Sequence, residues 1–319
     1  MRDDGVREDL RVQDLDEGEL LARVVPLMPT RALLGPGDDA ALVAAPDGRV
    51  VATTDVLVEF RDFRRDWSTA ADVGWKAVAQ NVADVAAMGA TCTGLLIGLG
   101  LPGDVEVAWV EGFAAGVAQA CARFGAVVVG GDLSAAGEVV VAVSALGDLG
   151  GRAPVLRSGA RAGDVVAVAG VLGRSAAGWE LLRTGAPDAR PDLLAAHRRP
   201  EPPVAAGPAA ALAGASALMD VSDGLLRDAG RIAAASGVSV ELSTGSALGE
   251  WAADLGGAGG LAQVLTGGED HALLGCFPAG TPLPEPFVPV GRVVAAGGHP
   301  VLVDGRPWAG PGGWDHFRR

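Results

Sequence analysis

The segment STAADVGWKAVAQNVADVAAMGA, residues 68–90, predicts a long helix between two β-rich runs, and this alternation sets the fold class. Ser68 or Thr69 is the candidate N-cap, and apolar residues follow at helical spacing. Before the helix, residues 35–55 alternate glycine turns with β-rich residues; after it, TGLLIGLGLP at 93–102 predicts an apolar strand. Strands that alternate with helices indicate an α/β, or α+β, architecture.

The same alternation continues to the end of the chain and indicates two domains. A helix is expected over about 104–124, followed by the strands AVVVGGD and EVVVAVSALGDLG. The pattern restarts near residue 150 with GGRAPVLRSGARAGDVVAVAG, and ALMDVSDGLLRDAG and TGGEDHALL then build a second α/β unit. We therefore expect an N-terminal domain at 1–148 and a C-terminal domain at 149–319, which suits a length of 319 residues.

Composition excludes several classes of partner. The formal net charge is −14 and Lys76 is the only lysine, so neither a nucleic acid nor an anionic membrane surface is an expected partner. Three widely spaced cysteines suggest neither a disulfide framework nor a zinc site, and we expect buried, reduced thiols. The acidic N-terminus does not resemble a signal peptide and no apolar run reaches about 20 residues, so a cytoplasmic protein is expected.

Aspartates recur at predicted strand ends and glycine turns. Any one of them alone is explained as a turn former or a helix cap. If several converge, carboxylates about 4 Å apart repel by about 4 kcal/mol per pair at an effective dielectric near 20, which bound cations would relieve. Ligands that are all oxygen favour Mg²⁺ over Zn²⁺. The recurring aspartates are Asp39, Asp55, Asp84, Asp132, Asp220 and Asp223.

The chain lacks the signatures of other phosphate-binding and hydrolytic classes. Lys76 follows VGW rather than a glycine-rich loop, which excludes a P-loop NTPase, and the HRD and DFG segments of protein kinases are missing. GLGLPG at 98–103 satisfies GxGxxG, but Pro102 lies inside it and we assign it to a strand-to-helix connection. There is no GxSxG, and the four histidines are scattered. A phosphate acceptor, ionised at about −2, needs no base, so direct in-line transfer is the expected mechanism.

Taken in order, the motifs GDDAA, TTDVLVE, KAVAQNVADVAAMGA, GGD, LRSGARAGD, GRSAAG, MDVSDGLLRD, TGGEDHALL and GWDHF resemble bacterial thiamine-monophosphate kinases. The resemblance runs from about residue 30 to the C-terminus. The superfamily also includes aminoimidazole ribonucleotide synthetase, selenophosphate synthetase and a hydrogenase-maturation enzyme. The last two are expected to carry a reactive Cys or selenocysteine near the N-terminus and a C-terminal Cys, respectively, and this chain has neither.

The resemblance implies an enzyme that phosphorylates thiamine monophosphate with ATP as co-substrate and several Mg²⁺ ions. It also implies a homodimer whose N-terminal domains pair their mixed sheets into a barrel, with the C-terminal domain completing the site. Mg²⁺ would be ligated by Asp39, Thr53, Thr54, Asp55, Asp84, Asp132, Asp220 and Asp223. ATP would contact Gly131, Asp132, Arg157 and Ser222, and the thiamine moiety would contact Glu269 and Trp314, whose ring suits a cationic thiazolium.

One segment departs from the family pattern. Where the family usually has VEGxHF, this chain has Val58-Glu59-Phe60-Arg61-Asp62-Phe63, so that Phe60 replaces a glycine and Asp62 a substrate-side histidine. A carboxylate near a phosphate acceptor is unfavourable unless it faces a metal ion or the thiazolium. Two alternatives therefore stay open: a superfamily enzyme with another acceptor, and a degenerate nucleotide-binding regulator.

Overall fold

The computed structural model describes residues 10–29, 33, 43–310 and 312–313, and the chain divides into two compact units. Unit 1 comprises Met1–Ala44, Ala52–Asn81 and Thr93–Leu146, and unit 2 comprises Ala45–Val51, Val82–Cys92 and Gly147–Arg319. Each holds one sheet, so the predicted mixed α/β class is confirmed. The assignment of nucleotide and metal binding to residues 1–148 stays a prediction.

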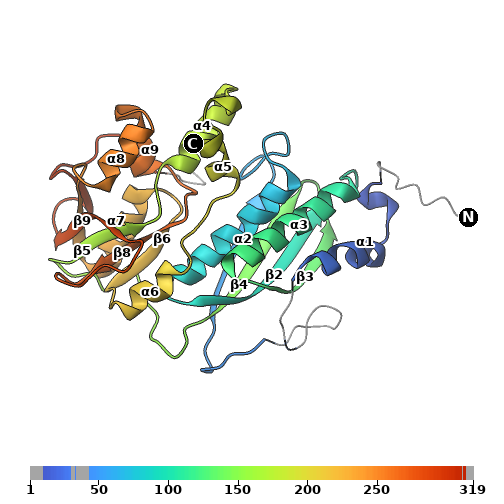
Figure 1. Cartoon of the computed structure of the whole chain (residues 1–319), viewed down its shortest axis with the longest axis horizontal. Helices are drawn as coiled ribbons and strands as arrows, with labels where there is room; N and C mark the ends of the chain where they lie inside the picture. The colour runs from blue at the N-terminus through green and yellow to red at the C-terminus, as the bar shows by residue number, and fades with distance from the viewer. Residues whose placement is uncertain (1–9, 30–32, 34–42, 311, 314–319) are drawn as a thin grey trace, which may run out of the picture. The chain divides into compact units, whose positions relative to one another are not determined.

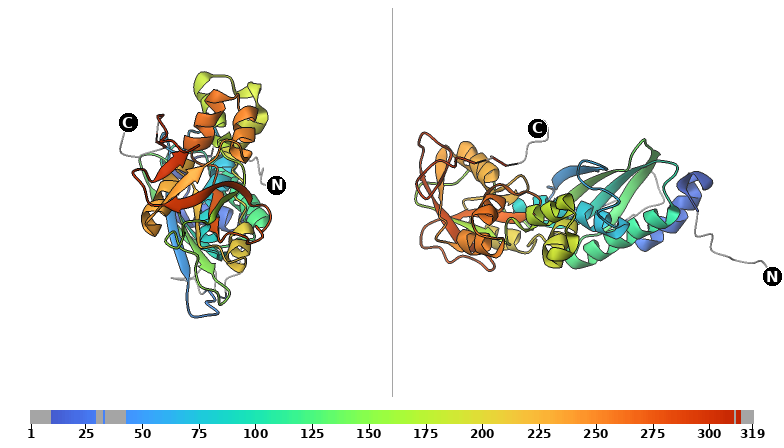
Figure 2. Two further views of the ribbon diagram at one scale, coloured as in Figure 1. Left: turned by 90° about the vertical axis from the view of Figure 1, so that its left-hand side faces the viewer. Right: turned by 90° about the horizontal axis from the view of Figure 1, so that it is seen from above.

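Unit 1 is a four-stranded sheet with the order β1-β4-β2-β3, in which β2 and β3 run parallel. Figures 1 and 2 show α2 and α3 side by side over one face of this sheet. The strands are β1 (Val51–Val58), β2 (Thr91–Leu101), β3 (Val128–Ala135) and β4 (Val140–Asp148). The helices are η1 (Val12–Asp14), α1 (Glu17–Val24), η2 (Val25–Leu27), α2 (Ala70–Ala87) and α3 (Val107–Phe124).

Local signals explain where the two long helices begin and end. The Thr69 hydroxyl accepts the Asp72 N–H at 3.2 Å while the Asp72 carboxylate accepts the Thr69 N–H at 3.0 Å, which is a reciprocal cap. Thr69 therefore fills the predicted capping role. Helix α3 ends at Gly125, whose φ of 73° is accessible at low cost only without a Cβ.

Helices α2 and α3 approach each other backbone to backbone. A Cβ placed on Gly74 of α2 would stand 2.2 Å from the Phe113 carbonyl oxygen, and one on Gly116 of α3 would stand 2.1 Å from the Ala71 carbonyl oxygen. Both distances are far below van der Waals contact. The two glycines therefore set the spacing of the helix pair over the sheet.

The sequence predictions for unit 1 hold with small corrections. Helix α1 gives way to the 3-10 turn η2 at Val25, because Pro26 cannot donate the next helical hydrogen bond. The glycine motif at 98–103 lies mostly in β2, which ends at Leu101, so only Pro102 and Gly103 belong to the predicted connection toward α3, and the motif is not a phosphate-binding loop. Within the segment 35–55, a turn is present at Gly48, as expected from its glycines, while most of the residues before it lie outside the described ones.

Unit 2 contains a six-stranded sheet with the order β10-β7-β9-β5-β8-β6. Its β7–β10 pair is parallel, and the pairs β7–β9, β5–β9, β5–β8 and β6–β8 are antiparallel. The strands are β5 (Val165–Ala169), β6 (Ala217–Val221), β7 (Val238–Leu242), β8 (Ala272–Phe277), β9 (Val288–Ala295) and β10 (Val301–Val303). The helices are α4 (Arg174–Thr184), η3 (Pro187–Ala189), α5 (Pro191–Arg198), α6 (Ala206–Leu212), α7 (Leu225–Ser236), α8 (Ala247–Asp254) and α9 (Ala258–Thr266).

Both faces of the unit 2 sheet are buried. Along β5, Val166 and Val168 belong to one core cluster, which includes Ile232 of α7, while Ala167 and Ala169 belong to another. This alternation follows from the two-residue period of a strand. Strands β5 and β8 are therefore apolar throughout, and functional groups near them are left to the strand ends.

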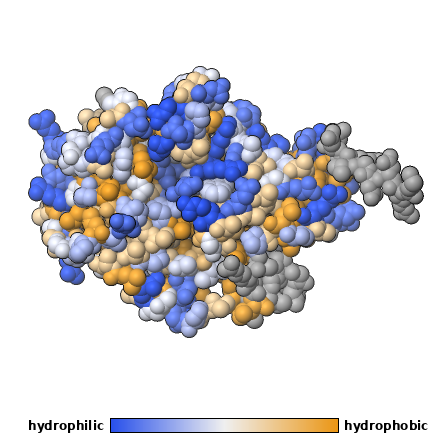
Figure 3. All heavy atoms as spheres, in the orientation of Figure 1, coloured by the Kyte–Doolittle hydropathy of each residue, from blue (hydrophilic) through white to orange (hydrophobic). Residues whose placement is uncertain are grey.

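The surface and the thiols agree with the composition, apart from one cysteine. Figure 3 shows hydrophilic residues spread over much of the visible face, with apolar residues between them. Within the described ranges, the helices lack the combination of length and apolar character that crossing a membrane requires. The three cysteines form no disulfide with one another, as predicted; Cys121 and Cys276 are buried, and Cys92, near the start of β2, is half-buried rather than buried.

We predict that Gly116→Ala lowers the free energy of unfolding by about 1–3 kcal/mol, because the new methyl group must push α2 away from α3. Gly230→Ala is the matched control, since a Cβ there would meet its nearest atom at 3.8 Å. The control should gain up to about 1 kcal/mol from helix propensity. Urea unfolding of both variants measures the change in the free energy of unfolding, which should be negative for Gly116→Ala and zero or positive for Gly230→Ala. Equal changes in the two variants would contradict the account of the helix pair.

Candidate functional site

The densest group of predicted site residues lies where β6 ends and β8 begins. These strands are antiparallel, with Val221 opposite Ala272, so the segments that follow β6 and precede β8 meet. The Glu269 N–H donates to the Ser222 carbonyl at 2.8 Å, and the His271 N–H donates to the Val221 carbonyl at 3.1 Å. The motifs MDVSDGL and TGGEDH, which are distant in sequence, therefore form one loop cluster, which we call the β6–β8 end.

Two glycines make this close approach possible. Gly224 has a φ of 110°, and a Cβ on it would stand 2.6 Å from the Thr266 carbonyl oxygen. A Cβ on Gly268 would stand 2.3 Å from the Ser222 carbonyl oxygen. Any side chain at either position would push the two loops apart. The glycines of both motifs thus allow the backbone of the turn after β6 to contact the backbone of the segment before β8.

Two predicted metal ligands stand at this end in different surroundings. Asp220 is 3% exposed and lies 3.5 Å, oxygen to nitrogen, from Nδ1 of His271. Asp223 follows in the turn, and its Oδ2 lies 2.6 Å from a guanidinium nitrogen of Arg231 and 3.7 Å from Nε of Arg227. Both carboxylates are therefore held by cationic or ring nitrogen groups of the same unit.

Asp228 is a structural residue of this end that the sequence analysis did not assign. It is 0% exposed, and its Oδ2 accepts the N–H groups of Ser222 at 3.1 Å and Asp223 at 3.0 Å, while Oδ1 lies 2.6 Å from Arg231. Burial and the negative charge of Asp220 raise the pKa of Asp228 to about 6. The sequence contains one signal for this role: within MDVSDGLLRD, an aspartate stands at a position that falls on the apolar face of helix α7.

Asp270 joins the same loops to helix α4. Its two carboxylate oxygens accept the N–H groups of Gly173 at 2.6 Å and Ser175 at 2.8 Å, at the N-terminal turn of the helix. Although the residue as a whole is only half-buried, burial of its carboxylate raises its pKa to about 7, against the lowering effect of these two bonds. Asp270 belongs to the motif TGGEDHALL, but its contact with α4 could not be inferred from that motif alone.

Glu269, the predicted thiamine contact, lies in the same loop. Its φ is 64°, which is unusual for a residue with a Cβ. Its side chain is 38% exposed, and Oε2 lies 3.5 Å from Nδ1 of the buried His197 of α5. The carboxylate is thus accessible on one side and held by the protein on the other.

Two further predicted site residues of unit 2, Arg157 and Asp84, belong to segments other than the β6–β8 end. Arg157 is exposed, and its carbonyl oxygen accepts the Ser236 hydroxyl at 3.0 Å. An exposed guanidinium is available to a phosphate. Asp84 is half-buried near the end of α2, in the part of that helix from Val82 onward that belongs to unit 2.

In unit 1, strand β1 separates the three predicted ligands onto two faces. Thr53 and Asp55 are two residues apart and share one face of the strand, while Thr54 points to the other. The Thr54 hydroxyl donates to the Val143 carbonyl at 3.0 Å and accepts a hydrogen bond from Ser144 at 3.1 Å. The side chains of Thr53 and Asp55 are therefore brought together, and that of Thr54 is not.

Gly131 and Asp132 lie on β3, at the opposite edge of the sheet from β1. A Cβ on Gly131 would stand 2.1 Å from the Ile97 carbonyl oxygen, so glycine is required beside β2. Asp132 is exposed next to Gly98. Two strands separate β1 from β3, so Asp55 and Asp132 are about 14 Å apart across the sheet and cannot ligate one ion within a single chain.

Asp62 has a local role in the turn after β1. Its Oδ2 accepts the Val58 N–H at 2.8 Å, while the Phe60 N–H donates to the Phe63 carbonyl at 2.8 Å. Phe60 is 68% exposed and has a φ of 66°, a conformation that glycine adopts without strain. The carboxylate that departs from the family pattern thus stabilises the turn.

The remaining predicted residues, Asp39 and Trp314, lie outside the described residues. Among the residues described, no group of three or more His, Cys, Asp or Glu side chains has the arrangement to hold a metal ion. The carboxylate oxygens at the β6–β8 end are nevertheless the type of ligand that a hard cation such as Mg²⁺ prefers. The effect of Asp220 on the pKa of Asp228 shows that negative charge accumulates there, which a divalent cation would relieve.

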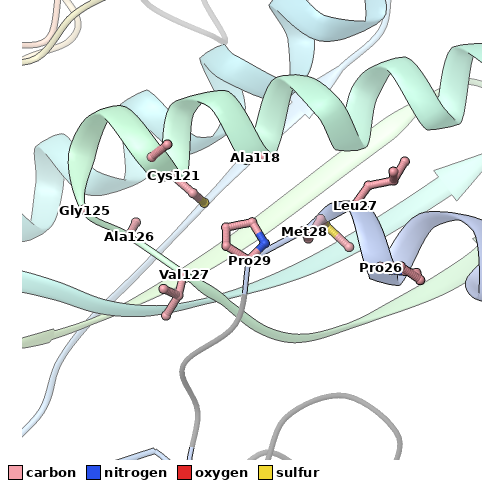
Figure 4. Close-up of a pocket in the computed structure, with 10 residues that line it drawn as sticks. Pro26, Leu27, Met28, Pro29, Ala118, Cys121, Gly125, Ala126 and Val127 are labelled. Atoms are coloured by element: carbon pink, nitrogen blue, oxygen red, sulfur yellow. The ribbon is translucent and has the colours of Figure 1, made fainter.

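A pocket of about 450 Å³ in unit 1 does not coincide with any of these residues. It lies between the segment Pro26–Pro29 and the C-terminal part of α3, and Cys121, Ala126 and Val127 also line it (Figure 4). Its lining side chains are apolar apart from one thiol and one thioether. It therefore lacks the charged groups that phosphate chemistry needs.

Comparisons with known proteins agree along nearly the whole chain. Residues 37–149 match the family described as AIR synthase related protein, N-terminal domain. A thiamine-monophosphate kinase of Mycobacterium tuberculosis is 48% identical over 317 residues, covering 97% of this chain and 94% of that protein. The crystal structure of thiamine-monophosphate kinase from Stenotrophomonas maltophilia is 32% identical, with a TM-score of 0.78 over 91% of this chain and 95% of that one. A structure of AaThiL complexed with AMPPCP and TMP is 35% identical, with a TM-score of 0.77 over 97% and 99%.

The raised pKa of Asp270 predicts a pH dependence of stability. From the ordinary value of 3.8 up to about 7, the folded chain keeps a proton that the unfolded chain releases. The free energy of unfolding due to this carboxyl therefore falls as pH rises through that range, by up to about 1.4 kcal/mol per pH unit. Asp270→Asn cannot ionise and should remove this slope.

Urea unfolding at a series of pH values measures the slope directly. Asp188→Asn, at an exposed position, is the matched control and should leave it unchanged. If Asp270→Asn has the same slope as the parent chain, the carboxyl is not protonated in the folded state at these pH values.

Proposed function

Because the chain belongs to the thiamine-monophosphate kinase family, we propose that it transfers the γ-phosphoryl group of ATP to thiamine monophosphate, producing thiamine diphosphate and ADP. The observation that carries this proposal is the β6–β8 end. It brings Ser222, Asp220 and Asp223, proposed for nucleotide and metal, beside Glu269, proposed for the acceptor. A related structure that holds AMPPCP and TMP together supports the same pairing of substrates.

We assign ATP binding to Gly131, Asp132, Arg157 and Ser222. Gly131 is exposed on the edge strand β3, where its backbone is accessible to a phosphate. Arg157 supplies an exposed guanidinium, and Ser222 a hydroxyl in a turn fixed by Asp228. Arg157 and Ser222 are hydrogen-bond donors for phosphate oxygens, and a glycine such as Gly131 lets a phosphate approach the backbone closely.

Several Mg²⁺ ions are part of the proposal. Bound with ATP, they supply charge neutralisation for the transferred phosphoryl group. The residues that would hold them are Asp39, Thr53, Thr54, Asp55, Asp84, Asp132, Asp220 and Asp223. The Thr54 side chain lies on the opposite face of β1 from Asp55, so the two side chains would not share one ion within a single chain.

The acceptor half of the site is assigned to Glu269, Trp314 and Asp62. The partly exposed Glu269 carboxylate offers charge complementarity to the thiazolium cation. An indole face at Trp314 would add a cation–π contact. Asp62 acts indirectly: it stabilises the turn after β1, and the conformation of that turn affects acceptor binding.

The reaction needs no base from the protein. An oxygen of the acceptor phosphate attacks the γ-phosphorus of ATP, the bond from that phosphorus to the bridging oxygen of ADP breaks, and its electron pair stays on ADP. The acceptor oxygen already carries negative charge, so no proton has to be removed. The described residues contribute orientation of the two phosphates, which is the main requirement of in-line transfer.

The proposal includes a homodimer in the cytoplasm. Asp55 and Asp132 lie on opposite edges of one sheet, about 14 Å apart across it, so a second chain beside an edge strand would bring further ligands within reach. Edge strands are also the natural place for two sheets to join.

We predict that the chain converts ATP and thiamine monophosphate to ADP and thiamine diphosphate in equal amounts when Mg²⁺ is present. Asp223→Asn should lower kcat by about 100-fold or more, because a ligand and a charge opposite the phosphates are lost. Asp188→Asn is the control with unchanged kcat. Quantifying both products by chromatography is the measurement.

Other outcomes discriminate among the alternatives. ADP without thiamine diphosphate, or ADP release only with a different phosphorylated or carbonyl acceptor, would contradict the proposed acceptor. Nucleotide binding by calorimetry without any turnover would instead favour a regulatory protein.

A further inference from the structure

The buried His197 faces the carboxylate that we assign to the acceptor. His197 lies on α5 and is 6% exposed, and its Nδ1 is 3.5 Å from Oε2 of Glu269 and 3.1 Å from the Ser175 hydroxyl. Ser175 is itself 1% exposed and belongs to α4. Two helices therefore present one ring nitrogen and one hydroxyl toward the loop that carries Glu269.

The position of His197 is fixed by helix packing. Gly178 of α4 lies so close to α5 that a Cβ on it would stand 2.1 Å from the Leu193 carbonyl oxygen and 2.9 Å from Cβ of His197. Helices that touch at glycine have little freedom to slide. The imidazole is thus anchored by the backbones of both helices.

The loop is joined to the same helices at its next residue. Asp270 accepts the N–H groups of Gly173 and Ser175, so it fixes the N-terminal turn of α4. Glu269 contacts His197, His197 contacts Ser175, and the Ser175 backbone contacts Asp270. This closed ring of contacts relates the Glu269 carboxylate to α4 and α5 rather than to its own loop alone.

The ring of contacts does not have the geometry of a hydrolytic triad. In such a triad, the nucleophile and the carboxylate occupy different nitrogens of the imidazole, so that a proton can pass through the ring. Here the Ser175 hydroxyl and Glu269 both lie at Nδ1. The arrangement can orient a carboxylate, but it cannot activate the serine.

We propose that His197, supported by Ser175, is a positioning residue that orients Glu269 toward the thiazolium end of the acceptor. This inference rests on the proposed function, since it assigns a source of affinity within the same site. With the proton on Nδ1, the ring N–H can donate to the Ser175 hydroxyl at 3.1 Å and also lies 3.5 Å from the Glu269 carboxylate, whose negative charge favours that tautomer. Glu269 has a strained φ and a partly exposed side chain, so without this contact its carboxylate has more orientations available.

The test compares two substitutions of His197. His197→Phe keeps an aromatic ring and removes the ring N–H, and it should raise KM for thiamine monophosphate about 10-fold, since the polar group that faces the Glu269 carboxylate is lost. KM for ATP should stay within about twofold of the parent value. His197→Asn places an amide N–H near the position of Nδ1 and should restore KM for thiamine monophosphate to within about threefold of the parent value. The exposed His299 provides the matched control, His299→Asn, with no change.

Two further variants keep the test decisive if His197→Phe does not fold. Ser175→Ala removes only a hydroxyl and should raise KM for thiamine monophosphate about threefold, with KM for ATP unchanged. In a Glu269→Gln background, Ser175→Ala should have no further effect on KM, because the carboxylate that Ser175 helps to orient is absent.

The outcomes separate this inference from the proposed function. If the parent chain forms thiamine diphosphate but KM for this acceptor is the same in His197→Phe and Ser175→Ala, His197 does not position Glu269 and only this inference fails. Equal increases in both KM values would show a general structural role and would also overturn it. If the parent chain forms no thiamine diphosphate, the proposed function fails and this inference falls with it.

Discussion

The close backbone contact between the turn after β6 and the loop before β8 is the constraint on which the rest of the site depends. The Glu269 N–H reaches the Ser222 carbonyl only because Gly224 and Gly268 leave room for the two chains to touch. Glu269 belongs to the acceptor half of the proposed site and Ser222 to the nucleotide half. One hydrogen bond thus fixes the distance between the two halves, and distance is what in-line transfer requires most.

Around this contact, buried carboxylates act on the backbone rather than on substrates. Asp228 accepts N–H groups of the turn after β6, and Asp270 accepts N–H groups at the start of α4. Both have raised pKa values because burial disfavours their charged forms. The acidic residues of this chain therefore divide into those that hold loops and those proposed to hold metal ions. Such an acidic chain can then bind anionic phosphates through cations and backbone N–H groups.

How far the sequence predicts the structure depends on the range of the contacts involved. The Thr69 cap and the strand–helix order arise from neighbouring residues, and both were predictable. The opposite orientation of Thr54 follows from strand alternation and was also within reach of the sequence. The roles of Asp228, Asp270 and His197 were not, because each depends on which loop or helix the tertiary fold places beside it. The Asp62 change, puzzling in sequence, is explained by a hydrogen bond within its own turn.

The central claim is that the protein aligns two phosphates and transfers the phosphoryl group in one step, without a covalent intermediate on the chain. ATP made chiral at its γ-phosphorus with oxygen isotopes tests this most directly. The account predicts inversion of configuration at that phosphorus in the thiamine diphosphate product, as a single in-line displacement requires. Retention of configuration would show two successive displacements through a phosphorylated residue, and would contradict the account.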